Sequence, residues 1–246
     1  MDDVQVVVAH SERVTLRVGD VFLKVDADPA RLEAEAEAMA AAPIPTAPIL
    51  WRQPSVIALG ALPGQALGRL GEPSPASPAA WAAAGAAART LHDAPLPARP
   101  GRRADSLVRA ELEAECELLV ASGMLPAGLV ARNRAVAEAA FRPFTPAFAH
   151  GDFQITHVFI DGDRVTGVLD WSEAGQGDPM FDLATLTLGH EDRLADVLAG
   201  YGPGADPAAI RAWWSLRSLL NVRWLAEHGF DPFAPGCEVD VLRARA

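Results

Sequence analysis

The chain has 246 residues, half of them apolar, so it can bury a hydrophobic core without disulfide or metal cross-links. Its 32 acidic and 21 basic residues give a formal net charge of −11, which argues against a partner that is nucleic acid or anionic membrane, because both require clustered Lys and Arg. Two cysteines without metal-site spacing, no signal-peptide pattern and no apolar run of roughly 20 residues predict a cytoplasmic protein that does not span a membrane.

The first part of the chain predicts a small antiparallel sheet with one helix. Residues 4–8, 13–18 and 21–25 are short β-branched segments separated by HSE and GD, a pattern typical of a meander. A helix is expected in DPARLEAEAEAMAAA, because Asp28 and Pro29 form a start signal and the prolines of PIPTAP end it. ILWRQ and SVIALGAL predict two more strands, and the stretch PGQALGRLGEPSPASP marks a boundary.

The remainder of the chain is predicted to be mainly helical. Three helices are expected in PAAWAAAGAAARTLHDA, RADSLVRAELEAECELLVASG and PAGLVARNRAVAEAAF, where apolar residues recur at helical spacing. VFID and VTGVLDW, joined by GDR, then predict a β-hairpin. Three further helices follow in FDLATLTLG, RLADVLAGYG and PAAIRAWWSLRSLLNVRWLAEHG, and Trp213, Trp214 and Trp224 in the last of them are expected to line a core face.

Several motifs are similar to those of a known enzyme family. VFLKV provides a strand lysine, EAEAEAM a helix glutamate and ALGALPGQAL a hinge, and TLHDAPL, HGDFQITH, GVLDW and GDPMFDLA follow in order. The last three together are specific, and the chain resembles the aminoglycoside phosphotransferase and choline kinase family over essentially its whole length. This resemblance implies an α+β, two-lobed, protein-kinase-like fold. Residues 1–64 would form a nucleotide-binding lobe with its hinge, and residues 65–246 a helical lobe with the catalytic hairpin and substrate site.

The resemblance also implies a role for each polar residue, and the chemistry of phosphoryl transfer agrees. The reaction needs a cation at the phosphates, carboxylates for Mg²⁺ and a carboxylate near the attacking hydroxyl. Asp152 would accept or orient the hydroxyl proton, and Asp170, at the end of the strand VTGVLD, would bind the metal. Lys24 would reach the phosphates of ATP or GTP, steadied by Glu35, whereas Glu33 and Glu37 would point elsewhere unless the register shifts.

Two positions depart from the family pattern. The loop AHSERV lacks the glycines that let backbone amides approach phosphates, so Ser11 is only a candidate phosphate donor. His157 stands where family members have a metal-binding asparagine. Mg²⁺ prefers oxygen ligands, whereas an imidazole nitrogen suits softer metals, and Mn²⁺ would accept it better than Mg²⁺. We expect His157 either to coordinate the metal or to hold Asp152 by hydrogen bonding.

Three functions are therefore open from the sequence. The first is a small-molecule kinase for a hydroxyl of an aminoglycoside or another antibiotic, and the second is a nucleotide-binding pseudokinase. The third is a metal-dependent hydrolase that uses His150 together with Asp152, His157 and Asp170, although His150 is better interpreted as a brace for the turn.

Glu173 and Asp178 are candidates for binding a cationic acceptor. Asp182 is expected to cap or anchor the helix that follows it. The oligomeric state stays open.

Overall fold

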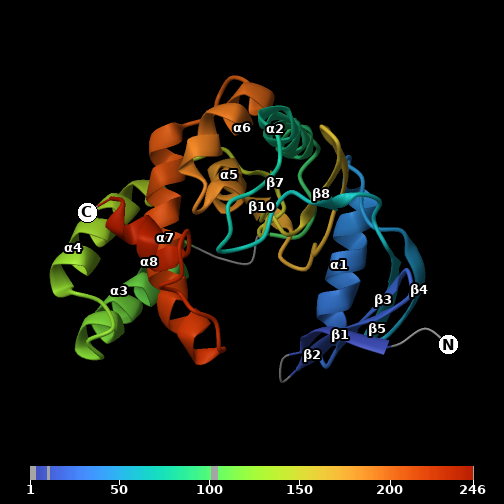
Figure 1. Ribbon diagram of the computed structural model, residues 1–246, viewed down its shortest axis with the longest axis horizontal. Coiled ribbons are helices and arrows are strands. Elements are labelled where there is room, and N and C mark those ends of the chain that lie inside the picture. Colours follow the sequence, from blue (N-terminus) through green and yellow to red (C-terminus); the bar gives the residue numbers. More distant parts are fainter. Residues whose placement is uncertain (1–3, 10–11, 101–104, 246) are drawn as a thin grey trace.

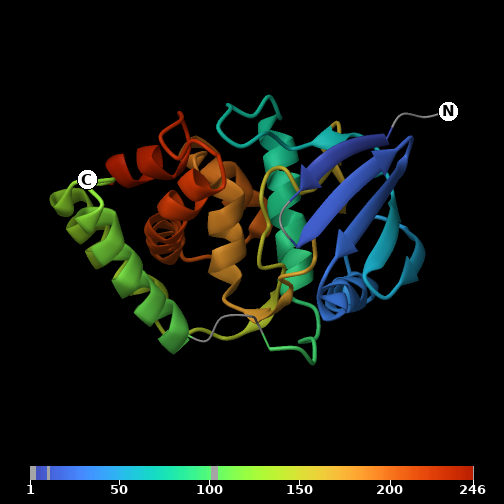
Figure 2. The same ribbon diagram turned by 90° about the horizontal axis from the view of Figure 1, so that it is seen from below.

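The computed structural model describes residues 4–9, 12–100 and 105–245. The N-terminal residues form a twisted antiparallel sheet with one helix against it, and the rest of the chain forms a larger, mainly helical part (Figure 1). Seen from below, the sheet stands at one end of the molecule, and the chain runs on into helices that extend away from it (Figure 2). The fold is therefore α+β, as the sequence predicts.

The N-terminal sheet has five strands in the order β1-β2-β3-β5-β4. These are β1 (Val4–Ala9), β2 (Arg13–Val18), β3 (Val21–Asp26), β4 (Ile49–Gln53) and β5 (Val56–Gly60), and every neighbouring pair is antiparallel. Helix α1 (Pro29–Ala41) begins as predicted, because the Asp28 side chain accepts a hydrogen bond from the Ala30 N–H and Pro29 occupies the first turn. Its buried face carries Leu32, Ala36 and Met39.

A second, smaller sheet connects the two parts of the molecule. Strand β6 (Gln65–Ala66) pairs with β8 (Val158–Asp161), which forms the predicted hairpin with β9 (Arg164–Val168). The turn of this hairpin contains Gly162 with φ 58°, a left-handed conformation that costs glycine little. Residues 65–66 therefore belong by hydrogen bonding to the same sheet as the hairpin that precedes Asp170.

The helical part is built around four helices that share one hydrophobic core. These are α2 (Pro78–His92), α5 (Pro179–Thr187), α6 (Leu194–Tyr201) and α7 (Pro207–Glu227). Helices α2 and α6 lie so close that a Cβ on Gly85 would come within 2.1 Å of the Val197 carbonyl oxygen. Largely buried side chains such as Trp81, Phe148 and Trp171 extend this core to the small sheet.

A second hydrophobic cluster covers the other side of α7. It is formed by α3 (Asp105–Ala121), α4 (Ala127–Ala137), the short 3-10 helix η1 (Glu138–Phe141) and α8 (Glu238–Arg243), which all contact α7. A further 3-10 turn, η2 (Glu191–Arg193), precedes α6. Helix α7 thus separates the two clusters and carries side chains toward both.

The structure corrects the sequence predictions at several elements. Strands β6, β7 (Ala147–Ala149) and β10 (Gly175–Gly177) and helix α8 were not predicted, because segments this short show no hydrophobic period. The core prediction is confirmed for Trp214, which is 1% exposed, and wrong for Trp224, which is 45% exposed. Trp224 lies near the C-terminal end of α7, where its ring stacks on His228 with centroids 4.1 Å apart. Within the described residues, no helix has both the length and the apolar character needed to cross a membrane.

Candidate active site

Asp152 lies in a tight turn that follows strand β7. Strand β7 pairs antiparallel with β10, and this pairing places the turn beside the segment that follows Asp170. Gly151 adopts φ 82°, and a Cβ at this position would lie 2.5 Å from the Glu173 carbonyl oxygen. Only glycine meets both demands, because other residues rarely take this conformation and any side chain would collide with the backbone.

The turn is held in place by the side chain of Asp182. Its carboxylate accepts the His150 N–H at 2.6 Å, the Gly151 N–H at 2.9 Å and a hydrogen bond from His92 Nε2 at 3.0 Å. Burial alone would raise the pKa of this carboxyl group, but the hydrogen bond from His92 and the nearby imidazoles outweigh burial and lower its pKa. Asp182 therefore anchors the turn of Asp152 to α5. Its role is structural, as predicted, but it does not cap the helix, because the N-cap of α5 is Asp178.

His150 links the backbone of Asp152 to that of Leu169, the residue before Asp170. Its Nδ1 accepts the Asp152 N–H at 3.2 Å, which leaves Nε2 as the donor to the Leu169 carbonyl oxygen at 3.0 Å. Burial lowers the pKa of this imidazole, in agreement with a neutral ring. Both ring nitrogens are occupied, so His150 braces the turn, as expected, and has no lone pair for a metal ion.

His150 does not fit the role of a ligand in a metal-dependent hydrolase, because both of its ring nitrogens are used within the protein. In the part of the chain that the structure describes, no group of three or more His, Cys, Asp or Glu side chains has a geometry that could hold a metal ion by itself. The four residues considered for a hydrolytic centre do not act as one ligand set. His150 accepts the Asp152 N–H, and the Asp152 carboxylate accepts a hydrogen bond from Gln154.

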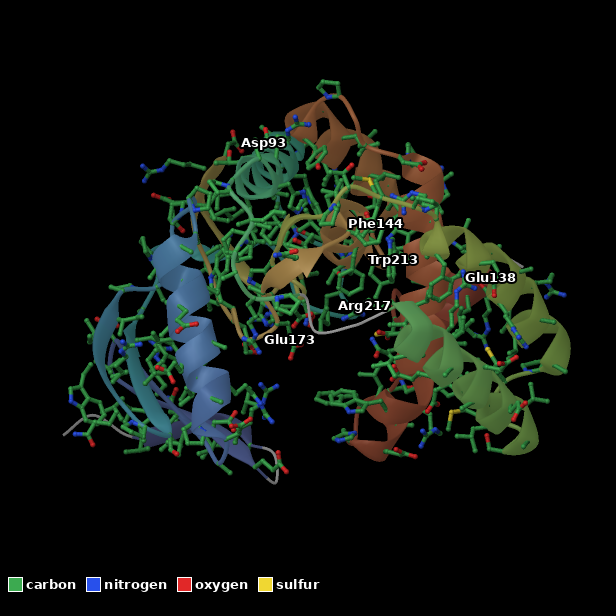
Figure 3. The ribbon with its side chains drawn as sticks, turned by 180° about the vertical axis from the view of Figure 1, so that it is seen from behind. Asp93, Glu138, Phe144, Glu173, Trp213 and Arg217 are labelled. Atoms are coloured by element: carbon green, nitrogen blue, oxygen red, sulfur yellow. The ribbon has the colours of Figure 1, made fainter. Side chains whose placement is uncertain are left out.

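Three side chains bring a nitrogen atom to within 3.8 Å of the Asp152 carboxylate, which is 26% exposed, and Gln154 is the one at hydrogen-bond distance among the described residues. The Gln154 Nε2 lies 2.7 Å from both carboxylate oxygens, and His157 Nδ1 lies 3.6 Å from Oδ2. Arg217, from α7, brings its Nη2 to 3.8 Å from Oδ1. Figure 3 shows Arg217 and Trp213 on the α7 side of this site and Glu173 on the side nearer α1 and the sheet.

Lys24 of β3 joins the sheet to the helical part. Its Nζ lies 2.5 Å from Glu35 Oε1 and 3.2 Å from Asp170 Oδ1. Glu35 is buried on α1, whereas Glu33 and Glu37 are exposed, so the structure selects Glu35 among the three glutamates. Burial tends to lower the pKa of Lys24, but the charges of Asp170 and Glu35 outweigh it and raise the pKa, which keeps the ammonium charged.

Asp170 lies two residues beyond the end of β9, not at the strand end as predicted. Its φ of 62° is unusual for a residue with a side chain, and such conformations persist where surrounding contacts fix them. Here the Oδ1 atom accepts from Lys24 and from the Ser172 hydroxyl at 3.2 Å. Burial opposes ionisation, but Lys24 and then His157 lower the pKa of Asp170 below its usual range.

His157 lies between the two aspartates. Its Nδ1 donates to the Asp152 carbonyl oxygen at 2.9 Å, so a neutral ring keeps its lone pair on Nε2. The side chain thus braces Asp152, which is one of its two expected roles, and the other nitrogen is chemically able to bind a metal. Mg²⁺ commonly takes one or two carboxylates and completes its shell with phosphate oxygens and water. Asp170, with a side chain 28% exposed, fits that requirement.

The remaining predicted residues differ in position. Ser11 lies outside the described residues. Glu173 is partly buried, and its backbone packs against Gly151. Asp178 is buried and is the N-cap of α5, where it accepts hydrogen bonds from Met180 N–H, Arg142 and Trp213. It contributes no contact to Asp152, so the structure brings it into a structural cluster instead of the site.

Sequence reasoning missed two residues that contact Asp152. Gln154 was visible in the motif HGDFQITH, and its position two residues after Asp152 is a signal that a turn aspartate has a local partner. Arg217 lies on a distant helix, and nothing in its local sequence distinguishes it from the other arginines of α7. Its proximity to Asp152 depends on how α7 crosses the helical part.

Comparison with known proteins shows the family of this chain. The profile of the phosphotransferase enzyme family matches residues 8–213, which is most of the chain. The chain belongs to this family. Among curated proteins, it is similar to viomycin phosphotransferase of Streptomyces vinaceus, with 35% identity over 86 residues. That match covers 31% of this chain and only 30% of the relative's length.

Solved structures of phosphotransferases share the fold. The GDP complex of aminoglycoside 2'-phosphotransferase-IIIa has a TM-score of 0.71 and 18% identity, and the match covers 99% of this chain and 92% of that one. A choline/ethanolamine kinase family protein from Mesorhizobium loti has a TM-score of 0.64 and 21% identity, with 99% and 85% covered. The protein-kinase-like fold expected of this phosphotransferase is thereby confirmed.

Proposed function

We propose that this phosphotransferase moves the γ-phosphate of ATP or GTP to a hydroxyl group of a small molecule, and that it works in the cytoplasm. The observation that carries the proposal is the placement of Lys24, Glu35 and Asp170 in one ion-paired cluster, linked through His150 to the turn of Asp152. Phosphoryl transfer depends on positioned charges more than on covalent chemistry, and this cluster supplies charges of both signs.

Each residue has a role in this reaction that follows from its surroundings. Lys24 binds phosphate oxygens, and Glu35 holds the ammonium group in place through their ion pair. Asp152 accepts or orients the proton of the acceptor hydroxyl. Residues 65–246 would carry the acceptor site and residues 1–64 the nucleotide site, with the hinge in the segment ALGALPGQAL.

Asp170 would hold Mg²⁺, with His157 as a second, weaker ligand through Nε2. When bound, the ion neutralises charge on the transferred phosphoryl group. His157 at the same time fixes the Asp152 carbonyl through Nδ1. A single imidazole would then position Asp152 and bind the metal together with Asp170. Mn²⁺ would tolerate the nitrogen ligand better than Mg²⁺ does.

For the acceptor we propose a hydroxyl-bearing antibiotic. The relative named viomycin phosphotransferase and the aminoglycoside and macrolide phosphotransferases of like fold support this class. The net charge of −11 favours a cationic member of it, with Glu173 as the nearest candidate contact.

The test is a phosphorylation screen with the wild type and Asp152→Ala. Purified protein is incubated with ATP or GTP, with Mg²⁺ or Mn²⁺, and with viomycin, aminoglycosides, macrolides, choline or sugars, and phosphorylated product is measured by mass spectrometry. We expect product with the wild type and a loss of at least about 10²-fold in Asp152→Ala, with nucleotide affinity nearly unchanged. Turnover by Asp152→Ala within about tenfold of wild type would contradict the role of Asp152.

A nucleotide-binding pseudokinase predicts a different result. It would bind ATP with little dependence on Mg²⁺ and would yield no phosphorylated product. Calorimetry with and without the metal separates the two functions, because a kinase should bind metal and nucleotide with positive coupling.

A further inference from the structure

Arg217 extends from α7 toward the carboxylate of Asp152. Its Nη2 lies 3.8 Å from Asp152 Oδ1, and its Nη1 lies 3.3 Å from Glu238 Oε1. The guanidinium group therefore lies between two carboxylates that come from different elements, the turn after β7 and the first residue of α8. Its side chain is 17% exposed, so solvent screens these contacts less than it would on an open surface.

Glu238 fixes the direction of this guanidinium group. The Glu238 side chain is 9% exposed, and a carboxylate this deeply buried is stable only with a cation beside it. Arg217 is that cation. Because the guanidinium group is planar and uses one Nη for each partner, its contact with Glu238 also sets where the other nitrogen points. A lysine carries its charge on one nitrogen, so it could contact both carboxylates only from a single point and would not reproduce the two-nitrogen geometry.

The contact ties Asp152 to a part of the molecule that its own segment does not reach. Gln154 and His157, the other side chains close to the carboxylate, belong to the same short segment as Asp152 and would move with it. Arg217 belongs to α7, which packs between the two hydrophobic clusters. A catalytic group displaced by about 1 Å can lose about 10²-fold in rate, so an anchor from a rigid helix matters for a base.

We propose that Arg217 is a positioning residue for Asp152 and that Glu238 holds Arg217 in place for this task. The inference rests on the proposed function, because it takes Asp152 as the group that receives the hydroxyl proton. Arg217 does not itself take part in proton transfer, since a guanidinium group stays protonated in proteins.

The test uses four variants and a matched control. The variants are Arg217→Gln, Arg217→Lys, Glu238→Gln and the double variant Arg217→Gln/Glu238→Gln. The control is Arg223→Gln on the same helix, because among the described residues Arg223 forms its ion pairs with Glu115 and Glu227 and not with Asp152. The probe is hydrolysis of ATP and GTP with Mg²⁺, which needs no acceptor, together with nucleotide affinity and melting temperature.

A purely structural ion pair and a positioning contact give different patterns. Arg217→Gln should lower kcat about 10-fold to 100-fold with little change in nucleotide KM, and it should also lower the melting temperature, because Glu238 loses its cation. The double variant should regain stability, since no buried charge is left unpaired, but it should not regain kcat. Arg217→Lys should retain more activity than Arg217→Gln. Arg223→Gln should lose some stability and keep its kcat.

Two results would overturn the inference while leaving the proposed function intact. One is a double variant that recovers both stability and kcat, and the other is an Arg217→Gln variant with wild-type kcat while Asp152→Ala is inactive. If Asp152→Ala hydrolyses nucleotide as fast as the wild type, the role that the proposed function gives to Asp152 is wrong.

A measurement that does not depend on activity completes the design. The urea midpoints of Asp152→Asn, Arg217→Gln and their double variant form a cycle that reports the coupling between the two side chains. We expect the two shifts to be non-additive. Additive shifts would show that Arg217 and Asp152 are not energetically coupled, whether or not the protein turns over nucleotide.

Discussion

Asp182→Asn is the sharpest test of how this protein holds the turn that carries Asp152. The carboxylate accepts the N–H groups of His150 and Gly151 and a hydrogen bond from His92, and it lies fully within the protein. An asparagine amide has only one acceptor oxygen. Whichever way the amide is turned, its NH₂ group faces one of the two backbone N–H groups, and that N–H loses its acceptor.

The size of the effect follows from these contacts. A buried N–H without an acceptor costs about 1–3 kcal/mol, and a hydrogen bond to a charged group contributes about 1.5–3 kcal/mol. Because the neutral amide can keep part of the network, we expect a loss of about 3 kcal/mol in the free energy of unfolding. For a chain of this size that corresponds to a fall of about 6–12 °C in melting temperature. Nucleotide hydrolysis should fall as well, because the released turn carries Asp152.

The effect should also depend on pH in a defined direction. The pKa of Asp182 is lowered in the folded protein, so its contribution to stability is complete above the usual pKa of about 4 and is lost as the pH falls through the folded value. The difference in stability between wild type and Asp182→Asn should therefore be constant near neutral pH and shrink below about pH 4.

Urea denaturation followed by circular dichroism at several pH values, with hydrolysis measured at neutral pH, checks these expectations. Asn133→Leu is a matched control, because Asn133 is a buried hub in the second cluster that donates to the Leu129 and Leu242 carbonyl oxygens and accepts from Ser215. It should lose stability but keep its activity per folded molecule. A difference below about 1 kcal/mol for Asp182→Asn, set against the roughly 3 kcal/mol expected for stranding a buried N–H, would refute the reasoning.

Two further substitutions test the nucleotide and metal side of the site. Glu35→Gln should raise the KM for ATP or GTP in steady-state assays, because Lys24 loses its buried partner and is drawn to Asp170. Glu37→Gln, at an exposed position of the same helix, should leave the KM unchanged. Equal effects of the two substitutions would count against the pairing of Lys24 with Glu35. His157→Asn should shift the preference from Mn²⁺ toward Mg²⁺ in metal titrations, since an amide oxygen replaces a nitrogen ligand, and an unchanged preference would mean that His157 only braces the Asp152 carbonyl.

Much of the local structure could be predicted because local chemistry decides it. The start of α1 follows from Asp28 and Pro29, and the β8–β9 hairpin follows from a short turn that contains glycine. The pairing of the strand lysine with a helix glutamate was predicted through the family resemblance, and the period of a helix added only that Glu35 lies on a different face from Glu33 and Glu37. These features need few residues, all close together in the chain.

The tertiary structure alone decided how buried polar groups are shared. Asp178 and Asp182 stand four residues apart in one motif, yet the first caps α5 and the second holds the turn of Asp152, since burial leaves each carboxylate only the donors within its reach. Trp224 lies outside the core because it belongs to the C-terminal end of α7, which extends beyond the core. Arg217 meets Asp152 only because α7 crosses behind the turn, and a contact between elements so far apart in sequence depends on packing that no local pattern records.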